Sequence, residues 1–247
     1  MVLVIAYISF SVLLYVKQRE LLYFPTPPME VTGATKVNLK SEVGVLKGWV
    51  VNPGMPKALI YFGGNGEQVE RNADFFIKCL PHHSVYLFPY RGYGGNPGSP
   101  SQDGLFSDAL LLEAFIKSRH SAVSIMGRSL GTGVAVYVAS KRPIEKLLLV
   151  TPYDSIAAVA TEKYPIFPVR WLLKDPFDSV AYANNVNAAV KILIATEDTI
   201  IPPGHSRALA KSFKQRPSVK YIEDADHNTI SSAEKYELES CGFLNQD

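Results

Sequence analysis

Residues 122–140, AVSIMGRSLGTGVAVYVAS, carry the pattern that decides the fold. A run of apolar residues leads into the pentapeptide GRSLG, and small and apolar residues with helical spacing follow it. Strand, G-x-S-x-G and helix in this order are typical of a nucleophile elbow, a sharp turn that exposes a serine at the end of a buried strand. Gly127 and Gly131 fit the elbow because a Cβ at either position would clash with the neighbouring strand and helix. An ordinary glycine-rich turn is the alternative, and we favour Ser129 as a nucleophile.

The rest of the chain alternates between strand-like and helix-like patterns. Short apolar runs bounded by glycine, proline or polar residues predict strands, and apolar residues three and four apart predict helices. The predicted strands are 35–41, 44–52, 58–62, 84–88, 122–126, 146–150, 191–195 and 219–223. The predicted helices are 67–80, 105–118, 130–140, 206–213 and 231–239. This alternation predicts an α/β fold, a doubly wound and mostly parallel sheet with helices on both faces, opened by a β-hairpin.

A nucleophilic serine needs a general base, and in this kind of sheet the base is a histidine late in the chain. Among the five histidines, His227 comes directly after the last predicted strand, and we expect it to be the base. His205 is expected to begin a helix and to be solvated. His82 and His83 precede the serine, and we expect both in a surface loop.

The base in turn needs an acid that orients it. Asp198 comes just after the strand 191–195, at the carboxyl edge where such an acid should stand. Asp154 follows the preceding strand and is the rival, and Glu197 is a more distant alternative. The ordinary role for either aspartate is to cap a helix. We favour Asp198.

An acyl-transfer site also needs two N–H donors for the oxyanion. The amide of Leu130, directly after the nucleophile, should be one donor. The second is expected from the glycine-rich loop at 63–66, which follows an early strand, with Asn65 as the donor position. A turn that merely caps the next helix is the alternative for this loop.

The beginning of the chain has a different composition. Residues 2–16, VLVIAYISFSVLLYV, are apolar and uncharged. This run is slightly shorter than the roughly 17–25 residues of a membrane-spanning helix. A Lys17 or Arg19 side chain that reaches to the membrane surface would allow the helix to extend beyond the run. We favour a single-pass membrane anchor over residues 1–24 and a catalytic domain over 25–247. A cleaved signal peptide fits less well, since no basic residue precedes the run, and a buried core helix is the third alternative. The basic residues after the run favour a domain facing the cytoplasm.

Composition excludes several classes of protein. The chain has 247 residues, 47% of them hydrophobic, which excludes global disorder. A net charge of +2 gives no electrostatic signal for nucleic acid. Cys79 and Cys241 are too few for a disulfide scaffold or a zinc finger, and we expect no metal. The sequence leaves open whether they form a disulfide.

Several motifs share one family pattern. They are FGGN at 62–65, YRGYG at 90–94, GRSLG at 127–131, Asp198 followed by Ile201-Pro202, and Asp226-His227. Together they resemble the α/β-hydrolase superfamily, in its single-pass membrane-anchored branch related to dienelactone hydrolases and prolyl-oligopeptidase-like enzymes. The resemblance covers most of the chain and implies an α/β-hydrolase fold.

The chain also departs from the family pattern. Gly63 replaces the usual histidine of His-Gly-Asn, and Pro89 replaces the usual aspartate before Tyr-Arg-Gly. Between the strands 146–150 and 191–195 lies a short stretch rich in aromatic residues and proline, which predicts a small lid rather than a large cap domain.

The predicted function is a serine hydrolase that cleaves carboxylic esters or thioesters through an acyl-serine intermediate, without a cofactor. The expected partner is a small-molecule or lipid acyl substrate, and the sequence carries no signal for an oligomeric state. Two alternatives remain open: a serine peptidase using the same three residues, and a membrane-tethered scaffold that keeps the fold without activity.

Overall fold

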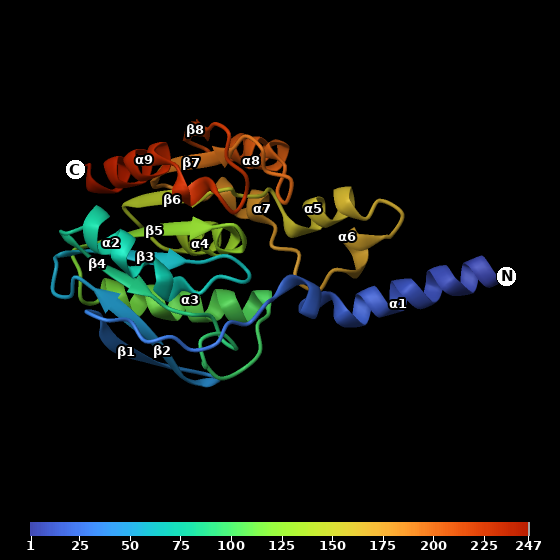
Figure 1. Cartoon of the computed structure of the whole chain (residues 1–247), viewed down its shortest axis with the longest axis horizontal. Coiled ribbons are helices and arrows are strands. Elements are labelled where there is room, and N and C mark those ends of the chain that lie inside the picture. Colours follow the sequence, from blue (N-terminus) through green and yellow to red (C-terminus); the bar gives the residue numbers. More distant parts are fainter. Residues whose placement is uncertain (247) are drawn as a thin grey trace.

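An eight-stranded sheet forms the centre of the molecule in the computed structural model, which describes residues 1–246 (Figure 1). The strands are β1 (Thr35–Ser41), β2 (Gly44–Val51), β3 (Lys57–Phe62), β4 (His83–Leu87), β5 (Ala122–Arg128), β6 (Lys146–Val150), β7 (Ala189–Ala195) and β8 (Ser218–Ile222). Their order in the sheet is β1-β2-β4-β3-β5-β6-β7-β8. The hairpin β1–β2 joins β4 in antiparallel fashion, and the strands from β4 to β8 pair in parallel. The predicted α/β sheet, with its opening hairpin, is confirmed.

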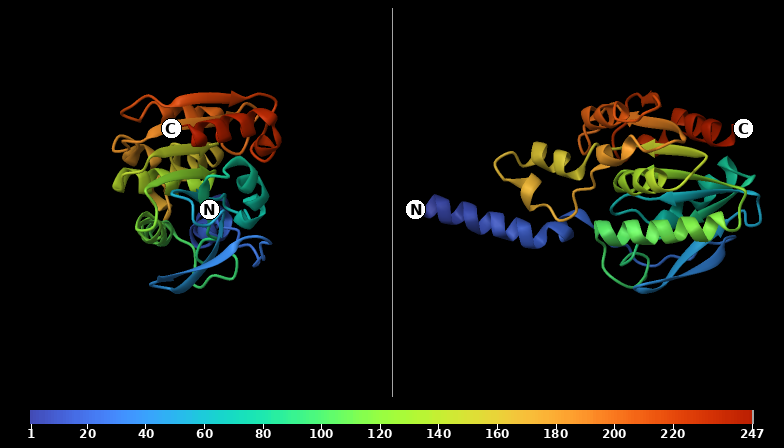
Figure 2. Two further views of the ribbon diagram at one scale, coloured as in Figure 1. Left: turned by 90° about the vertical axis from the view of Figure 1, so that its left-hand side faces the viewer. Right: turned by 180° about the vertical axis from the view of Figure 1, so that it is seen from behind.

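Helices cover both faces of this sheet (Figure 2). The helices are α1 (Val2–Leu22), α2 (Ala73–Cys79), α3 (Gln102–Lys117), α4 (Leu130–Lys141), α5 (Ile156–Lys163), α6 (Val169–Leu172), α7 (Ser179–Ala183), α8 (Pro203–Ala210) and α9 (Glu234–Asn245), with 3₁₀ turns η1 (Val69–Asn72) and η2 (Ile230–Ser232). Buried side chains of α3, α4, α7 and α8 pack on one face. Those of α2 and α9 pack on the other. All five residues of β4 and of β6 are buried, as expected for strands covered on both sides.

Two features of the second quarter of the chain differ from their predictions: the start of one helix and the burial of one histidine. The predicted helix 67–80 begins only with η1 and α2, because the Glu67 carboxylate accepts a hydrogen bond from the Gly64 N–H at 2.7 Å and holds the preceding residues in a loop. His83 is not in a surface loop: it begins β4 and is only 4% exposed. Burial lowers the pKa of its imidazole below the usual value.

Helix α1 projects beyond the carboxyl edge of the sheet, and only the lid formed by α5 and α6 lies beside most of its length (Figures 1 and 2). Every residue of α1 is exposed or half-exposed, so a buried core helix is the wrong interpretation of this segment. By length and composition α1 is able to cross a membrane. The boundary after residue 24 stays a prediction.

Cys79 at the end of α2 and Cys241 in α9 form a disulfide, with their Cα atoms 5.3 Å apart. The two helices lie on the same face of the sheet, and the bond joins points 162 residues apart in the sequence. The pairing that the sequence left open is therefore present in the structure.

Replacing both cysteines by alanine is expected to lower the free energy of unfolding by about 2–4 kcal/mol, because the unfolded chain loses a long covalent loop. Urea unfolding in mild detergent measures this change. A reductant should lower the urea concentration at which half of the natural chain is unfolded, and it should leave this midpoint unchanged in the double variant. An unchanged midpoint in the reduced natural chain would contradict the expectation.

Candidate active site

The turn between β5 and α4 places Ser129 at the carboxyl edge of the sheet. Ser129 has a φ of 50°, a left-handed conformation that is strained for a residue with a side chain. A Cβ on Gly127 would lie 2.6 Å from the Gly131 carbonyl oxygen, and one on Gly131 would collide with the backbone of Phe62. The two glycines therefore allow the helix to approach the sheet closely enough to form the sharp turn.

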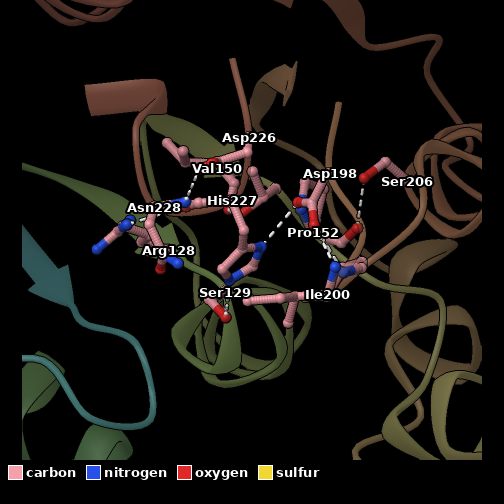
Figure 3. A network of polar contacts seen from close by, with 12 residues as sticks. Arg128, Ser129, Val150, Pro152, Asp198, Ile200, Ser206, Asp226, His227 and Asn228 are labelled. Atoms are coloured by element: carbon pink, nitrogen blue, oxygen red, sulfur yellow. Dashed lines mark hydrogen bonds and ion pairs between the residues drawn. The ribbon is translucent and has the colours of Figure 1, made fainter. Parts of the chain in front are cut away.

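Ser129, His227 and Asp198 form a hydrogen-bonded line (Figure 3). His227 Nε2 lies 2.8 Å from Ser129 Oγ, and His227 Nδ1 lies 2.7 Å from Asp198 Oδ2. All three side chains belong to buried residues, with 5–8% of each residue exposed. The structure thus brings together the three residues that the motifs select, from the loops that follow β5, β7 and β8.

The acid and the base are each held by their own loops. Asp198 Oδ1 accepts hydrogen bonds from the N–H groups of Ile200 and Ile201 at 2.9 and 2.8 Å, which leaves Oδ2 directed at the imidazole. Next to His227, the carboxylate of Asp226 accepts hydrogen bonds from the N–H groups of Thr229 and Asn228. These bonds, that from Thr229 first, lower the pKa of Asp226 and fix the turn that carries the histidine.

Asp154, the alternative acid, has a different partner. Its Oδ1 lies 2.9 Å from Nδ1 of His205, whose Nε2 lies 3.0 Å from the Glu162 carboxylate in the lid. His205 is 8% exposed, so the expectation of a solvated histidine is wrong. The Asp154–His205 pair is separate from the line of Ser129, His227 and Asp198.

The two expected oxyanion positions border the same cavity as Ser129. Leu130 is the first residue of α4, where a backbone N–H has no partner within its own helix and the helix dipole favours negative charge. Asn65 is fixed from two sides: its Nδ2 donates to the Leu22 carbonyl at 3.0 Å, and its own carbonyl accepts from the Phe24 N–H and the Tyr93 hydroxyl. The donor role of both amides stays a prediction.

An ion pair missed by the sequence reasoning connects the oxyanion loop to the histidine loop. Glu67 accepts the Gly64 N–H and the Tyr61 hydroxyl, each at 2.7 Å, and lies 3.3 Å from the Arg128 guanidinium. Arg128 donates in turn to the backbone carbonyl of His227 at 3.1 Å. The only sequence signal for this pair is a charged residue at the second position of the elbow pentapeptide, next to a run of apolar residues.

Both departures from the family pattern fit their surroundings. A Cβ at residue 63 would lie 2.5 Å from the Val69 side chain, so a histidine would displace Val69. The Gly63 carbonyl accepts a hydrogen bond from the Tyr90 hydroxyl at 2.9 Å, and the Pro89 carbonyl accepts one from Asn96 at 2.8 Å. The backbone at both positions is therefore held by other side chains.

A cavity of about 520 Å³ opens at Ser129. This volume lies in the usual range for a small-molecule site, about 300–1,000 Å³. Most of its walls are apolar side chains from α1, the lid and the loop after β7. They include Leu14, Leu21, Leu22, Ile156, Val159, Tyr164, Phe167, Val169, Leu172, Leu173, Ile200 and Ile201. Residues 1–246 hold no cluster of histidine, cysteine or acidic side chains that could bind a metal ion.

Comparisons with known proteins agree with this architecture, although no family model matches. The uncharacterized protein Rv2307c of Mycobacterium tuberculosis is 30% identical over 244 residues, which span 92% of this chain and 87% of that protein. Lysophosphatidylserine lipase ABHD12 of Danio rerio is 34% identical over 147 residues, but the match covers 51% of this chain and 38% of the lipase. The esterase Pf2001 of Pyrococcus furiosus superposes with a TM-score of 0.69 at 20% identity, over 90% of this chain and 97% of the esterase.

The sheet order, the elbow and these likenesses define the fold as that of the α/β-hydrolases. The chain belongs to the α/β-hydrolase superfamily.

Replacing Glu67 by glutamine is expected to lower kcat by about 10- to 100-fold with little change in KM, because small displacements of positioned groups have effects of this size. Steady-state hydrolysis of p-nitrophenyl butyrate gives both constants. Glu30→Gln is the matched control, since Glu30 is an exposed carboxylate that also forms an ion pair, with Lys36. Equal kcat values for the two variants would show that the Glu67–Arg128 pair does not position the site.

Proposed function

We propose that the protein is a membrane-associated serine hydrolase that cleaves carboxylic esters or thioesters through an acyl-Ser129 intermediate. The observation that carries the proposal is the hydrogen-bonded line of Asp198, His227 and Ser129, formed at a strained turn beside an apolar cavity. Esterase and lipase relatives support the same reaction class.

The proposed reaction follows from the direction of the hydrogen bonds. Ser129 Oγ attacks the carbonyl carbon while His227 Nε2 takes its proton, and Asp198 stabilises the imidazolium that forms. The amides of Leu130 and Asn65 donate to the oxygen that becomes negatively charged. The leaving alcohol or thiol receives the proton from His227, and water then releases the acyl group by the same steps in reverse. The reaction requires neither a metal nor an organic cofactor.

The structure favours an ester or thioester over the two alternatives. The walls of the cavity are mostly apolar, which suits an acyl chain better than a peptide with its many polar backbone groups. A scaffold without activity has no need to hold Ser129 at a φ of 50°. These features support a hydrolase with an apolar acyl substrate.

We propose further that α1 is retained as a membrane anchor. Its Arg19 forms an ion pair with Asp175, which follows the lid, and its Leu22 carbonyl accepts a hydrogen bond from Asn65. Cleavage as a signal peptide would remove both contacts. The basic residues after the apolar run favour a cytoplasmic domain, whereas the disulfide between Cys79 and Cys241 favours an oxidising compartment. We give the disulfide more weight than the two basic residues and propose that the domain lies on the non-cytoplasmic side.

Labelling with a fluorophosphonate probe tests the proposed nucleophile. Ser129→Ala is expected to abolish labelling. Asp198→Asn and His227→Ala are expected to slow it by at least about 100-fold, because each removes part of the base that activates the serine. The labelling rate is read from a gel after timed quenching.

Asp154→Asn is the matched control, since it changes an aspartate that pairs with a different histidine. It should label at nearly the rate of the natural chain. Labelling that survives Asp198→Asn and fails in Asp154→Asn would transfer the role of the acid to Asp154. Absence of labelling in folded natural protein would favour the scaffold.

A further inference from the structure

We propose that the lid (residues 156–173) lies in one leaflet of the bilayer, beside the part of α1 that it contacts, and that α1 forms a wall of the acyl-binding cavity. The substrate would then be an ester or thioester with one fatty acyl chain that enters from the membrane. The part of this proposal that concerns acyl binding rests on the proposed function. The part that concerns insertion of the lid in the membrane is independent of catalysis.

The lid is fastened to α1 along most of that helix. Near the N-terminus the Tyr7 hydroxyl donates to the Ile166 carbonyl at 2.8 Å, and the Tyr7 ring stacks on Phe167 with centroids 5.4 Å apart. Near its other end Gln18 donates to the Leu172 carbonyl and accepts from the Lys174 N–H. These contacts hold the lid against α1 at both ends of the length that they share.

The length of this contact corresponds to the thickness of one leaflet. Tyr7 and Gln18 are 11 positions apart, so the lid follows α1 for about 16 Å at 1.5 Å per residue. Half of a bilayer's hydrocarbon core is about 15 Å. If α1 is inserted in a membrane, the lid beside it must enter the same leaflet.

The outer surface of the lid is suited to that environment. Trp171 is 90% exposed and Ile166 is 70% exposed, while tryptophan is enriched where proteins meet the membrane interface. The nearby Arg170, Lys163 and Lys174 have stems long enough to carry their charges to the headgroups. Exposed apolar side chains beside an exposed apolar helix favour contact with lipid rather than water.

The backbone at the tip of the lid is also suited to lipid, where unpaired polar groups are costly. Pro165 and Pro168 have no N–H to satisfy. The N–H groups of Phe167 and Val169 donate to carbonyl groups within the lid, and the Ile166 carbonyl accepts from Tyr7. Few backbone groups of this loop would therefore lose hydrogen bonds by leaving water.

One side of α1 borders the cavity that contains the nucleophile. Ser11, Leu14, Gln18 and Leu22 lie three or four positions apart, and all four border the cavity that contains Ser129. These positions are half-buried, whereas their neighbours on the outer side of α1 are exposed. A cavity with one wall supplied by a membrane helix can receive an acyl chain without passing it through water, and its volume of about 520 Å³ suits one chain rather than two.

The role of α1 in binding the acyl chain is tested with two substrates of different acyl chain length, p-nitrophenyl acetate and p-nitrophenyl octanoate. Their hydrolysis by the full-length protein is measured in detergent. In the natural chain we expect kcat/KM to be at least about tenfold higher for octanoate, since each methylene buried in an apolar pocket contributes up to about fourfold. Leu14→Trp fills the cavity from α1 and should lower kcat/KM for octanoate by at least about tenfold, with less than about a twofold effect on acetate.

Leu13→Trp is the matched control, because Leu13 is 53% exposed and faces away from the cavity. It should leave both substrates unchanged. Equal losses for octanoate and acetate in Leu14→Trp, or equal effects of the two tryptophans, would overturn the role of α1 in binding the acyl chain. Hydrolysis of neither ester by the natural chain, with no difference from Ser129→Ala, would instead overturn the proposed function.

Tryptophan fluorescence tests insertion of the lid in the membrane independently of activity. The chain has two tryptophans, and Trp49 is only 8% exposed in β2, so Trp49→Phe leaves Trp171 as the single reporter. In Ser129→Ala protein bound to phosphatidylcholine vesicles, we expect lipids brominated along their acyl chains to quench Trp171. Trp171→Phe, which retains Trp49, should show no quenching. Emission of Trp171 that is the same in brominated and plain vesicles would overturn immersion of the lid.

Discussion

The close approach of α4 to the backbone of β3 is the constraint on which the site depends. Gly131 lies so near the carbonyl of Phe62 that no side chain fits between them, and this contact forces the preceding turn to be sharp. The strain at Ser129 is its local consequence, because a φ of 50° is maintained only where surrounding packing determines it. The core on both faces of the sheet, which fixes β3, β5 and α4 relative to one another, thus stabilises a conformation that the turn alone would not adopt.

The loops around this turn are coupled rather than independent. Glu67 holds the oxyanion loop, Arg128 lies beside it in the elbow, and the His227 carbonyl accepts from the same guanidinium. A buried charge pair is stabilising only when its remaining hydrogen-bonding groups are satisfied. Here the Gly64 N–H, the Tyr61 hydroxyl and the His227 carbonyl satisfy most of them, whereas the buried Arg128 Nε has no hydrogen-bond partner among residues 1–246. The arrangement fixes the relative positions of the nucleophile, the base and the expected oxyanion donors.

The sequence predicted the features that have a fixed period or spacing. The apolar runs gave the parallel strands, and the order of the elbow, Asp198 and His227 selected side chains that lie within hydrogen-bond distance. Features that depend on tertiary contacts were missed or left open. Glu67 lies in a loop, where its carboxylate binds the Gly64 N–H and the Arg128 guanidinium. His83 is buried by neighbouring strands, and the fold brings Cys241 to Cys79. Such contacts leave no periodic signal in one sequence.

The hydrogen bond from Asn65 to the Leu22 carbonyl connects the end of α1 with the loop beside the nucleophile. A carbonyl at the end of a helix has no partner within its own helix, so this bond satisfies both the helix and the loop. Proteolytic shedding of the domain from its helix would remove the acceptor together with one wall of the cavity. On the proposed function, a fragment without α1 would keep its sheet and its three hydrogen-bonded side chains but would hydrolyse its substrate less efficiently. The membrane helix would then also be a structural part of the site.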